Sequence, residues 1–109
     1  MTPIPLSIRH ELEGLERMER CARESLECSG RLEWHHAIQM GGRRLQEAWA
    51  ILPACVYHHR LSGKNDEHFR HLAYQNISEE ALSRYKTGAQ MIVEKNYLKQ
   101  KYVHRIPRG

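Results

Sequence analysis

Several features that define large classes of proteins are missing from this sequence of 109 residues. No apolar run approaches the roughly 18–20 residues needed to span a bilayer, so we expect no membrane-spanning segment. The first residues lack the basic-then-apolar order of a signal peptide, which predicts a cytoplasmic chain. Three cysteines cannot form a disulfide framework, and reduced thiols suit burial or metal binding. No repeat, low-complexity tract or linker divides the chain, so we expect a single domain over residues 1–109.

The basic residues are unevenly distributed. Residues 84–109 hold seven basic side chains and one acidic side chain, whereas residues 1–83 hold ten basic and twelve acidic ones. A concentrated positive segment attracts phosphates through counterion release, but a solvated lysine-rich helix face would explain the same charge. The charge alone therefore leaves contact with a nucleic acid open.

Hydrophobic spacing and capping residues predict a small α+β domain, in which a β-hairpin plus helix is flanked by an N-terminal helix and C-terminal helices. The apolar run that forms the second strand contains Pro53, which restricts that strand to an edge or to its own end. The expected elements are a helix from Ser7 to about residue 23 or 24, strands over 31–38 and 49–56, a helix over 67–74 capped by Asn65 or Asp66, and a basic C-terminal helix over 78–104.

Four of the eight histidines form two adjacent pairs that bracket this hairpin, His35-His36 and His58-His59. Neighbours on a strand point to opposite faces, so one histidine of a pair can bind a metal while the other faces a substrate. Neutral imidazole ligates divalent metals, and its ordinary pKa near 6.5 suits a general base. The placement of the pairs therefore predicts a metal-dependent site beside the hairpin.

The segments EWHHAIQMGG (33–42) and WAILPACVYHHR (49–60) resemble the HNH, or ββα-metal, endonucleases, in particular their small phage- or prophage-encoded branch. The resemblance covers about residues 28–104, with the motif core over 28–75, and its specific part is 33–59. It implies hydrolysis of phosphodiester bonds in DNA inside a bacterial host cell. It also implies one divalent metal ion, for which zinc, nickel or manganese would suit imidazole ligands better than magnesium.

The resemblance assigns roles to the histidines. His35 falls on the first metal-ligand position, His36 on the general base that activates water, and His59 on the ligand that opens the final helix. His58 falls where many relatives carry a cysteine of a structural zinc site. It is therefore either a zinc ligand or an alternative to His59 as ligand of the catalytic metal.

Two departures from the family pattern concern the loop and the zinc site. The asparagine that braces the loop in relatives is replaced by Ala50, and Gln46 is the nearest amide able to substitute for it. The usual four zinc-binding cysteines are incomplete. A mixed set of Cys21, Cys28, Cys55 and His58 would satisfy tetrahedral zinc, but reduced cysteines are more often small buried apolar residues.

Other charged residues near these motifs have two interpretations. Arg43 and Arg44 follow a glycine pair and can place guanidinium groups against a DNA backbone, and Arg60 and Lys64 follow the second histidine pair. A plain turn with solvated side chains explains them equally well. Glu33 can orient a ligating imidazole, but we expect it to be a surface residue of the strand.

Two other classes of function fit the same sequence. The first is a zinc-stabilised nucleic-acid-binding module without catalysis, in which every histidine and cysteine is structural. The second is a protein-interaction adaptor that uses the C-terminal helix, and that helix also leaves a homodimer open.

Overall fold

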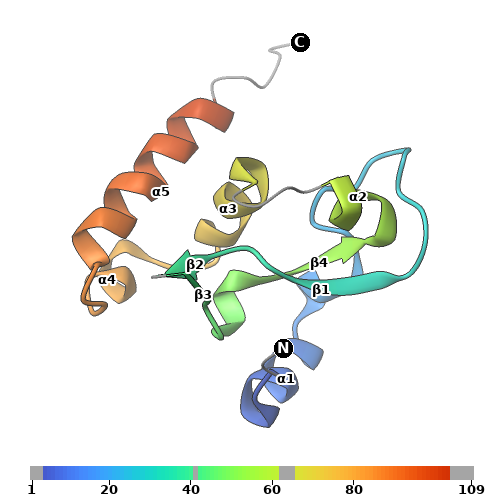
Figure 1. The fold of residues 1–109 in the computed structure, drawn as a ribbon, viewed down its shortest axis with the longest axis horizontal. Helices are drawn as coiled ribbons and strands as arrows, with labels where there is room; N and C mark the ends of the chain where they lie inside the picture. The colour runs from blue at the N-terminus through green and yellow to red at the C-terminus, as the bar shows by residue number, and fades with distance from the viewer. Residues whose placement is uncertain (1–3, 41, 62–65, 104–109) are drawn as a thin grey trace.

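The structure is a computed structural model that describes residues 4–40, 42–61 and 66–103. Short helices and two small antiparallel sheets confirm the α+β fold (Figure 1). No helix in this part of the chain is long and apolar enough to cross a membrane. The elements in chain order are α1 (Leu6–Glu13), η1 (Glu16–Glu19), β1 (Leu32–His36), β2 (Gln39–Met40), β3 (Arg43–Arg44), η2 (Ala48–Ala50), β4 (Ile51–Cys55), α2 (Val56–Leu61), α3 (Glu67–Tyr74), α4 (Glu79–Leu82) and α5 (Gly88–Val103).

The two predicted strands pair in the central sheet, in which β1 lies antiparallel to β4. Leu32 is opposite Cys55, and His36 is opposite Ile51. The connection between them is longer than a tight turn, because β2 and β3 form a second hairpin before η2 leads into β4. Pro53 is tolerated in the middle of β4 because this strand pairs only with β1 and is therefore an edge.

Alternation along β4 divides the apolar core between the two faces of the sheet. Leu52 and Ala54 belong to a cluster with Phe69 of α3 and with residues of α4 and α5, whereas Ile51 packs with Leu12 of α1. Figure 1 shows α3 and α1 on opposite sides of the sheet. Residues of β1 follow the same alternation, since Trp34 packs against the α1 cluster and His35 contacts Phe69.

Two predicted helices are corrected by the structure. The first helix ends at Glu13, far before residue 23, because Gly14 is its C-cap and the backbone of Leu15 is extended. The basic C-terminal segment is two helices rather than one over 78–104. The chain turns between α4 and α5, and the turn brings Gly88, the first residue of α5, against the carbonyl oxygen of Leu82. A Cβ at residue 88 would collide with this oxygen, so glycine is required there.

The N-cap of α3 was predicted correctly. The carboxylate of Asp66 accepts a hydrogen bond from the backbone N–H of Phe69 at 3.1 Å, and the helix covers the expected residues Glu67–Tyr74. The other proposed cap, Asn65, lies outside the described residues.

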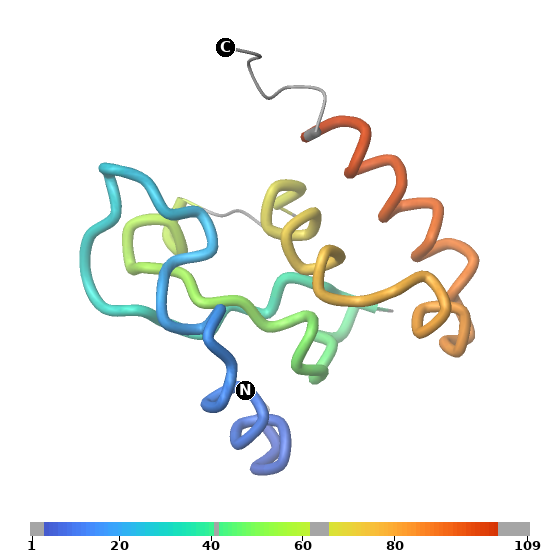
Figure 2. Tube along the Cα trace, turned by 180° about the vertical axis from the view of Figure 1, so that it is seen from behind, coloured from blue at the N-terminus to red at the C-terminus, as the bar shows by residue number. Residues whose placement is uncertain are grey.

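Residues 20–31 contain no helix or strand and form a long loop beside α2 (Figure 2). Three backbone hydrogen bonds attach this loop to the end of the hairpin. The N–H of Ala22 donates to Pro53, that of Val56 donates to Arg31, and that of Tyr57 donates to Ser29. Gly30 is in the left-handed region with φ at 82°, and a Cβ there would lie 2.8 Å from the Cβ of Val56.

Replacement of Gly30 with alanine is expected to lower the free energy of unfolding by about 1–3 kcal/mol, because a positive φ and the clash with Val56 both act against a side chain. Gly14→Ala is the matched control, since φ there is −89° and the nearest atom to a Cβ is 3.7 Å away. The control is expected to be neutral or to gain about 0.4–1 kcal/mol. Urea unfolding at fixed metal concentration measures both variants, and equal effects would contradict this account of the loop.

Candidate metal centre and histidine pair

Four potential metal donors from three segments meet at one end of the hairpin. Cys21 and Cys28 come from the loop of residues 20–31, Cys55 is the last residue of β4, and His58 lies in the first turn of α2. Their donor atoms all lie within 4.8 Å of one another, and we call this group the Cys3His cluster. Among the described residues it is the only group of three or more histidine, cysteine or acidic side chains that converges in this way.

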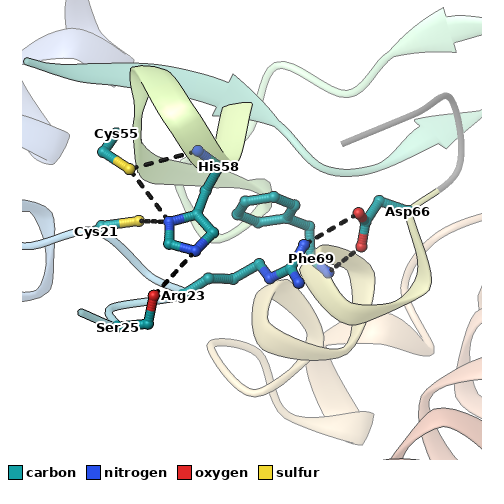
Figure 3. Close-up of polar contacts among 7 residues, drawn as sticks. All are labelled: Cys21, Arg23, Ser25, Cys55, His58, Asp66 and Phe69. Atoms are coloured by element: carbon teal, nitrogen blue, oxygen red, sulfur yellow. Dashed lines mark hydrogen bonds and ion pairs between the residues drawn. The ribbon is translucent and has the colours of Figure 1, made fainter. Parts of the chain in front are cut away.

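The distances within the cluster match a tetrahedral ion. Nδ1 of His58 lies 3.5 Å from Sγ of Cys21, 3.4 Å from Sγ of Cys28 and 3.1 Å from Sγ of Cys55 (Figure 3 draws Cys21, Cys55 and His58). Zinc bound at about 2.3 Å from sulfur and about 2.0–2.1 Å from nitrogen would separate sulfur from nitrogen by about 3.5 Å in a regular tetrahedron. The four residues could therefore hold a metal ion such as zinc.

The surroundings act differently on two of the thiols, because burial raises the pKa of Cys21 whereas the pKa of Cys55 is lowered. Burial opposes ionisation of the Cys55 thiol, but hydrogen bonds from the backbone N–H groups of His58 and Ser29, together with contacts to the side chains of His58 and Cys28, lower its pKa to about 6. The other ring nitrogen of His58, Nε2, lies 3.4 Å from Oγ of Ser25, which can accept its proton. That contact orients the ring so that Nδ1 faces the three sulfur atoms.

The sequence left open whether His58 lies with the cysteines or takes the place of His59 beside His35. His58 lies with the cysteines and away from His35. The mixed ligand set considered from the sequence is the one that the structure brings together, although six residues separate Cys21 from Cys28. Four protein donors leave no open position, which is typical of structural rather than catalytic zinc.

The neighbouring histidine, His59, points to a different group. Successive residues of a helix are turned by about 100°, so His58 and His59 cannot face the same side. The rings of His59 and His35 are 5.0 Å apart between centroids and lie edge to face. We call His35 and His59 the histidine pair.

Glu33 orients one member of the histidine pair. Its carboxylate accepts a hydrogen bond of 2.9 Å from Nδ1 of His59. This contact and the charges of His59, Arg31 and Arg60 leave the pKa of Glu33 below its usual value, although desolvation acts to raise it. A carboxylate behind an imidazole fixes the tautomer in which Nε2 is the ligating nitrogen. Glu33 is therefore not only the surface strand residue that we expected. Its position two residues before His35, on the same strand face, was the signal for this role.

His35 is held in its neutral form. Burial above all, together with the nearby charges of His59, His36 and Arg44, lowers its pKa to about 4, although the carboxylate of Asp66 acts in the opposite direction. One face of the ring packs against Phe69, with 4.5 Å between the ring centroids. A neutral imidazole is the form that ligates metals.

His36 is held by the amide that was expected to replace the missing asparagine. Oε1 of Gln46 lies 3.0 Å from Nε2 of His36. Because an amide oxygen only accepts, this contact is a hydrogen bond in the tautomer that has the proton on Nε2. In that tautomer the lone pair on Nδ1 is the one that can take up a proton.

The arginines proposed to contact DNA are exposed. Arg43 and Arg44 lie on β3 and Arg60 lies on α2, whereas Lys64 falls outside the described residues. Part of the C-terminal positive charge is used within the fold, since Lys95 donates to the carbonyl of Ile77 and Lys101 pairs with Glu67. The positive surface is therefore smaller than the sequence suggested.

Comparison of the chain with protein-family models, with curated proteins and with solved structures finds no match in any of the three.

The metal content of the purified protein tests the Cys3His cluster. We expect about one zinc ion per chain, lost in His58→Ala and kept in the adjacent control His59→Ala, because only His58 completes the tetrahedron. Elemental analysis after dialysis measures both. Equal loss of zinc in the two variants would show that the cluster is not the site. Removal of the ion with a chelator is expected to lower the melting temperature, because binding is coupled to folding.

The low pKa of His35 predicts a pH dependence of stability. Between pH 6.5 and about 4 the unfolded chain takes up a proton at His35 that the folded chain does not, so wild type loses stability relative to His35→Gln as the pH falls. Below about pH 4 the difference becomes constant. Urea unfolding of both proteins across this pH range measures the difference in their free energies of unfolding. Loss of metal from the thiolates at low pH affects both proteins equally, because both contain the Cys3His cluster, and so does not contribute to this difference. A difference in the free energy of unfolding that does not change with pH would contradict the burial of a neutral His35.

Proposed function

We propose that this chain is a metal-dependent endonuclease of the HNH type that hydrolyses phosphodiester bonds in DNA, stabilised by a zinc ion in the Cys3His cluster. The observation that carries the proposal is the separation of the two histidine neighbourhoods. His58 completes a closed set of four donors, while His59 and His35 lie side by side and His36 follows His35 at the end of β1. A site that served stability alone would have no use for the second group.

The chemistry assigned to the second group requires a base and a ligand pair. Nδ1 of His36 accepts a proton from water, the water oxygen forms a bond to phosphorus, and the bond from phosphorus to the 3′-oxygen breaks. A divalent ion held by His35 and His59 would supply positive charge near the phosphate oxygens. Glu33 keeps His59 oriented, and Gln46 keeps His36 in the tautomer that can take up the proton.

Substrate contacts are assigned to the exposed arginines around this group. Arg44 is close enough to His35 for its charge to contribute to the lowered pKa of that ring, and Arg60 contributes in the same way to the lowered pKa of Glu33. Guanidinium groups at these positions can bind phosphates on either side of the histidine pair. Arg43 extends the positive charge along β3.

A non-catalytic zinc-stabilised module that binds nucleic acid is the second candidate. The completeness of the Cys3His cluster favours it, because this cluster explains a small stable fold without any reaction. The two candidates differ in what they predict for His36, which touches no atom of the cluster in either case.

Plasmid nicking separates the two candidates. The zinc-loaded protein is incubated with supercoiled plasmid and manganese, nickel, zinc or magnesium, and we expect nicking that falls at least about 100-fold in His36→Ala, since a general base contributes that much. Gln46→Ala is expected to lose about 10-fold, because it only orients the base. Zinc content and DNA binding should stay at wild-type values in both variants.

The control is His10→Ala, which removes an exposed histidine of α1. It should nick like wild type. Nicking by His36→Ala at the wild-type rate would refute His36 as the base. Zinc-loaded protein that binds DNA but nicks with none of the four ions would leave the non-catalytic module as the function.

A further inference from the structure

The loop that supplies Cys21 also sends a side chain toward α3. Arg23, two residues after Cys21, forms an ion pair with Asp66 at 3.3 Å between Nη1 and Oδ2 (Figure 3). Its guanidinium carbon lies 5.3 Å from the centroid of the Phe69 ring, over the aromatic face. Three-quarters of the Arg23 side chain is buried, since 26% of it is exposed.

Asp66 and Phe69 act together at the start of α3. One carboxylate oxygen of Asp66 accepts from the N–H of Phe69 as the N-cap, and the other pairs with Arg23. A single side chain therefore fixes both the first turn of the helix and the guanidinium. The Phe69 ring is fully buried and contacts both the guanidinium of Arg23 and the imidazole of His35, the latter at 4.5 Å between centroids.

The other end of Arg23 is held by the Cys3His cluster. Cys21 is buried within it, and the N–H of Ala22 donates to the carbonyl of Pro53 at 2.8 Å. The backbone on the N-terminal side of Arg23 is thus attached both to the cluster and to β4. These contacts form a continuous series from Cys21 through Arg23 and Phe69 to His35.

We propose that Arg23 is a positioning residue through which the loop of the Cys3His cluster sets the orientation of His35. The inference rests on the proposed function, since it concerns a residue assigned as ligand of the catalytic metal. It gives the cluster a role in addition to stability. Arginine suits this place because its planar group can pair with a carboxylate and stack on an aromatic ring at the same time, which lysine cannot do.

An effect on stability alone is the alternative. If Arg23 served stability alone, loss of the Arg23–Asp66 pair would lower the melting temperature and leave the orientation of His35 unchanged. Arg70 provides a control, because it lies on α3, its side chain is about as buried as that of Arg23, and it forms an ion pair with Glu94 of α5. Arg70→Gln removes a charge and an ion pair from α3 without touching the Phe69–His35 contact.

The experiment compares Arg23→Gln with Arg70→Gln in the zinc-loaded protein. Ring signals of His35 are recorded by NMR and assigned by their absence in His35→Gln, and cleavage of plasmid is measured with manganese as kcat and KM. We expect Arg23→Gln to shift the His35 signals and to lower kcat at least 10-fold with KM within about 3-fold. Arg70→Gln should change neither, at a similar loss in melting temperature. Asp66→Asn, which keeps an N-cap oxygen but removes the ion pair, should behave like Arg23→Gln and replaces it if that variant does not fold.

The outcomes separate this inference from the proposed function. Wild-type His35 signals in both Arg23→Gln and Asp66→Asn overturn the positioning role, even if His36→Ala shows that the chain is a nuclease. Equal shifts in the Arg23 and Arg70 variants also overturn it, because the effect would then be a general loosening of α3. If wild type nicks no DNA, the proposed function fails, and the His35 signals alone still decide whether Arg23 orients this ring.

Discussion

The convergence of Cys21, Cys28, Cys55 and His58 is the constraint on which the rest of the structure depends. The loop of residues 20–31 has no regular secondary structure and little apolar burial of its own, and an exposed Leu26 lies at its outer part. Without a bound ion, a few backbone hydrogen bonds would have to hold this segment against its conformational entropy. A metal ion held by the four donors would attach the loop to the end of β4 and the start of α2, the two elements that also place His59.

Two adjacent histidines at the start of α2 serve opposite sides of the helix. The ring of His58 turns to the sulfur atoms, and the ring of His59 turns to Glu33 and His35 on β1. The second neighbourhood is therefore built on elements that the first one fixes. Residues that hold the fold and residues assigned to the reaction are thus distinct, although they are neighbours in the chain. Arg23 joins the two neighbourhoods by a route outside α2, through Phe69 of α3.

Local patterns in the sequence predicted some of this arrangement and could not predict the rest. The two strands of the central sheet and the cap of α3 at Asp66 follow from alternation and capping. The end of α1 at Glu13 and the break before Gly88 depend on packing against other elements, which periodicity does not record. The four residues of the Cys3His cluster could be proposed from the sequence by ligand type, but their convergence could not be predicted, because Cys21 and Cys28 lie in a loop whose path has no local signature. Glu33 and Arg23 gain their partners only when residues 26 and 43 positions away fold beside them.

The measurement that tests this account most directly is X-ray absorption at the zinc edge of the purified wild-type protein. The account predicts three sulfur atoms at about 2.3 Å and one nitrogen atom at about 2.0–2.1 Å around each zinc ion. Zinc surrounded by two or fewer sulfur atoms together with oxygen, or by imidazole nitrogen alone, would contradict it, because the loop of residues 20–31 would then not be held by the Cys3His cluster.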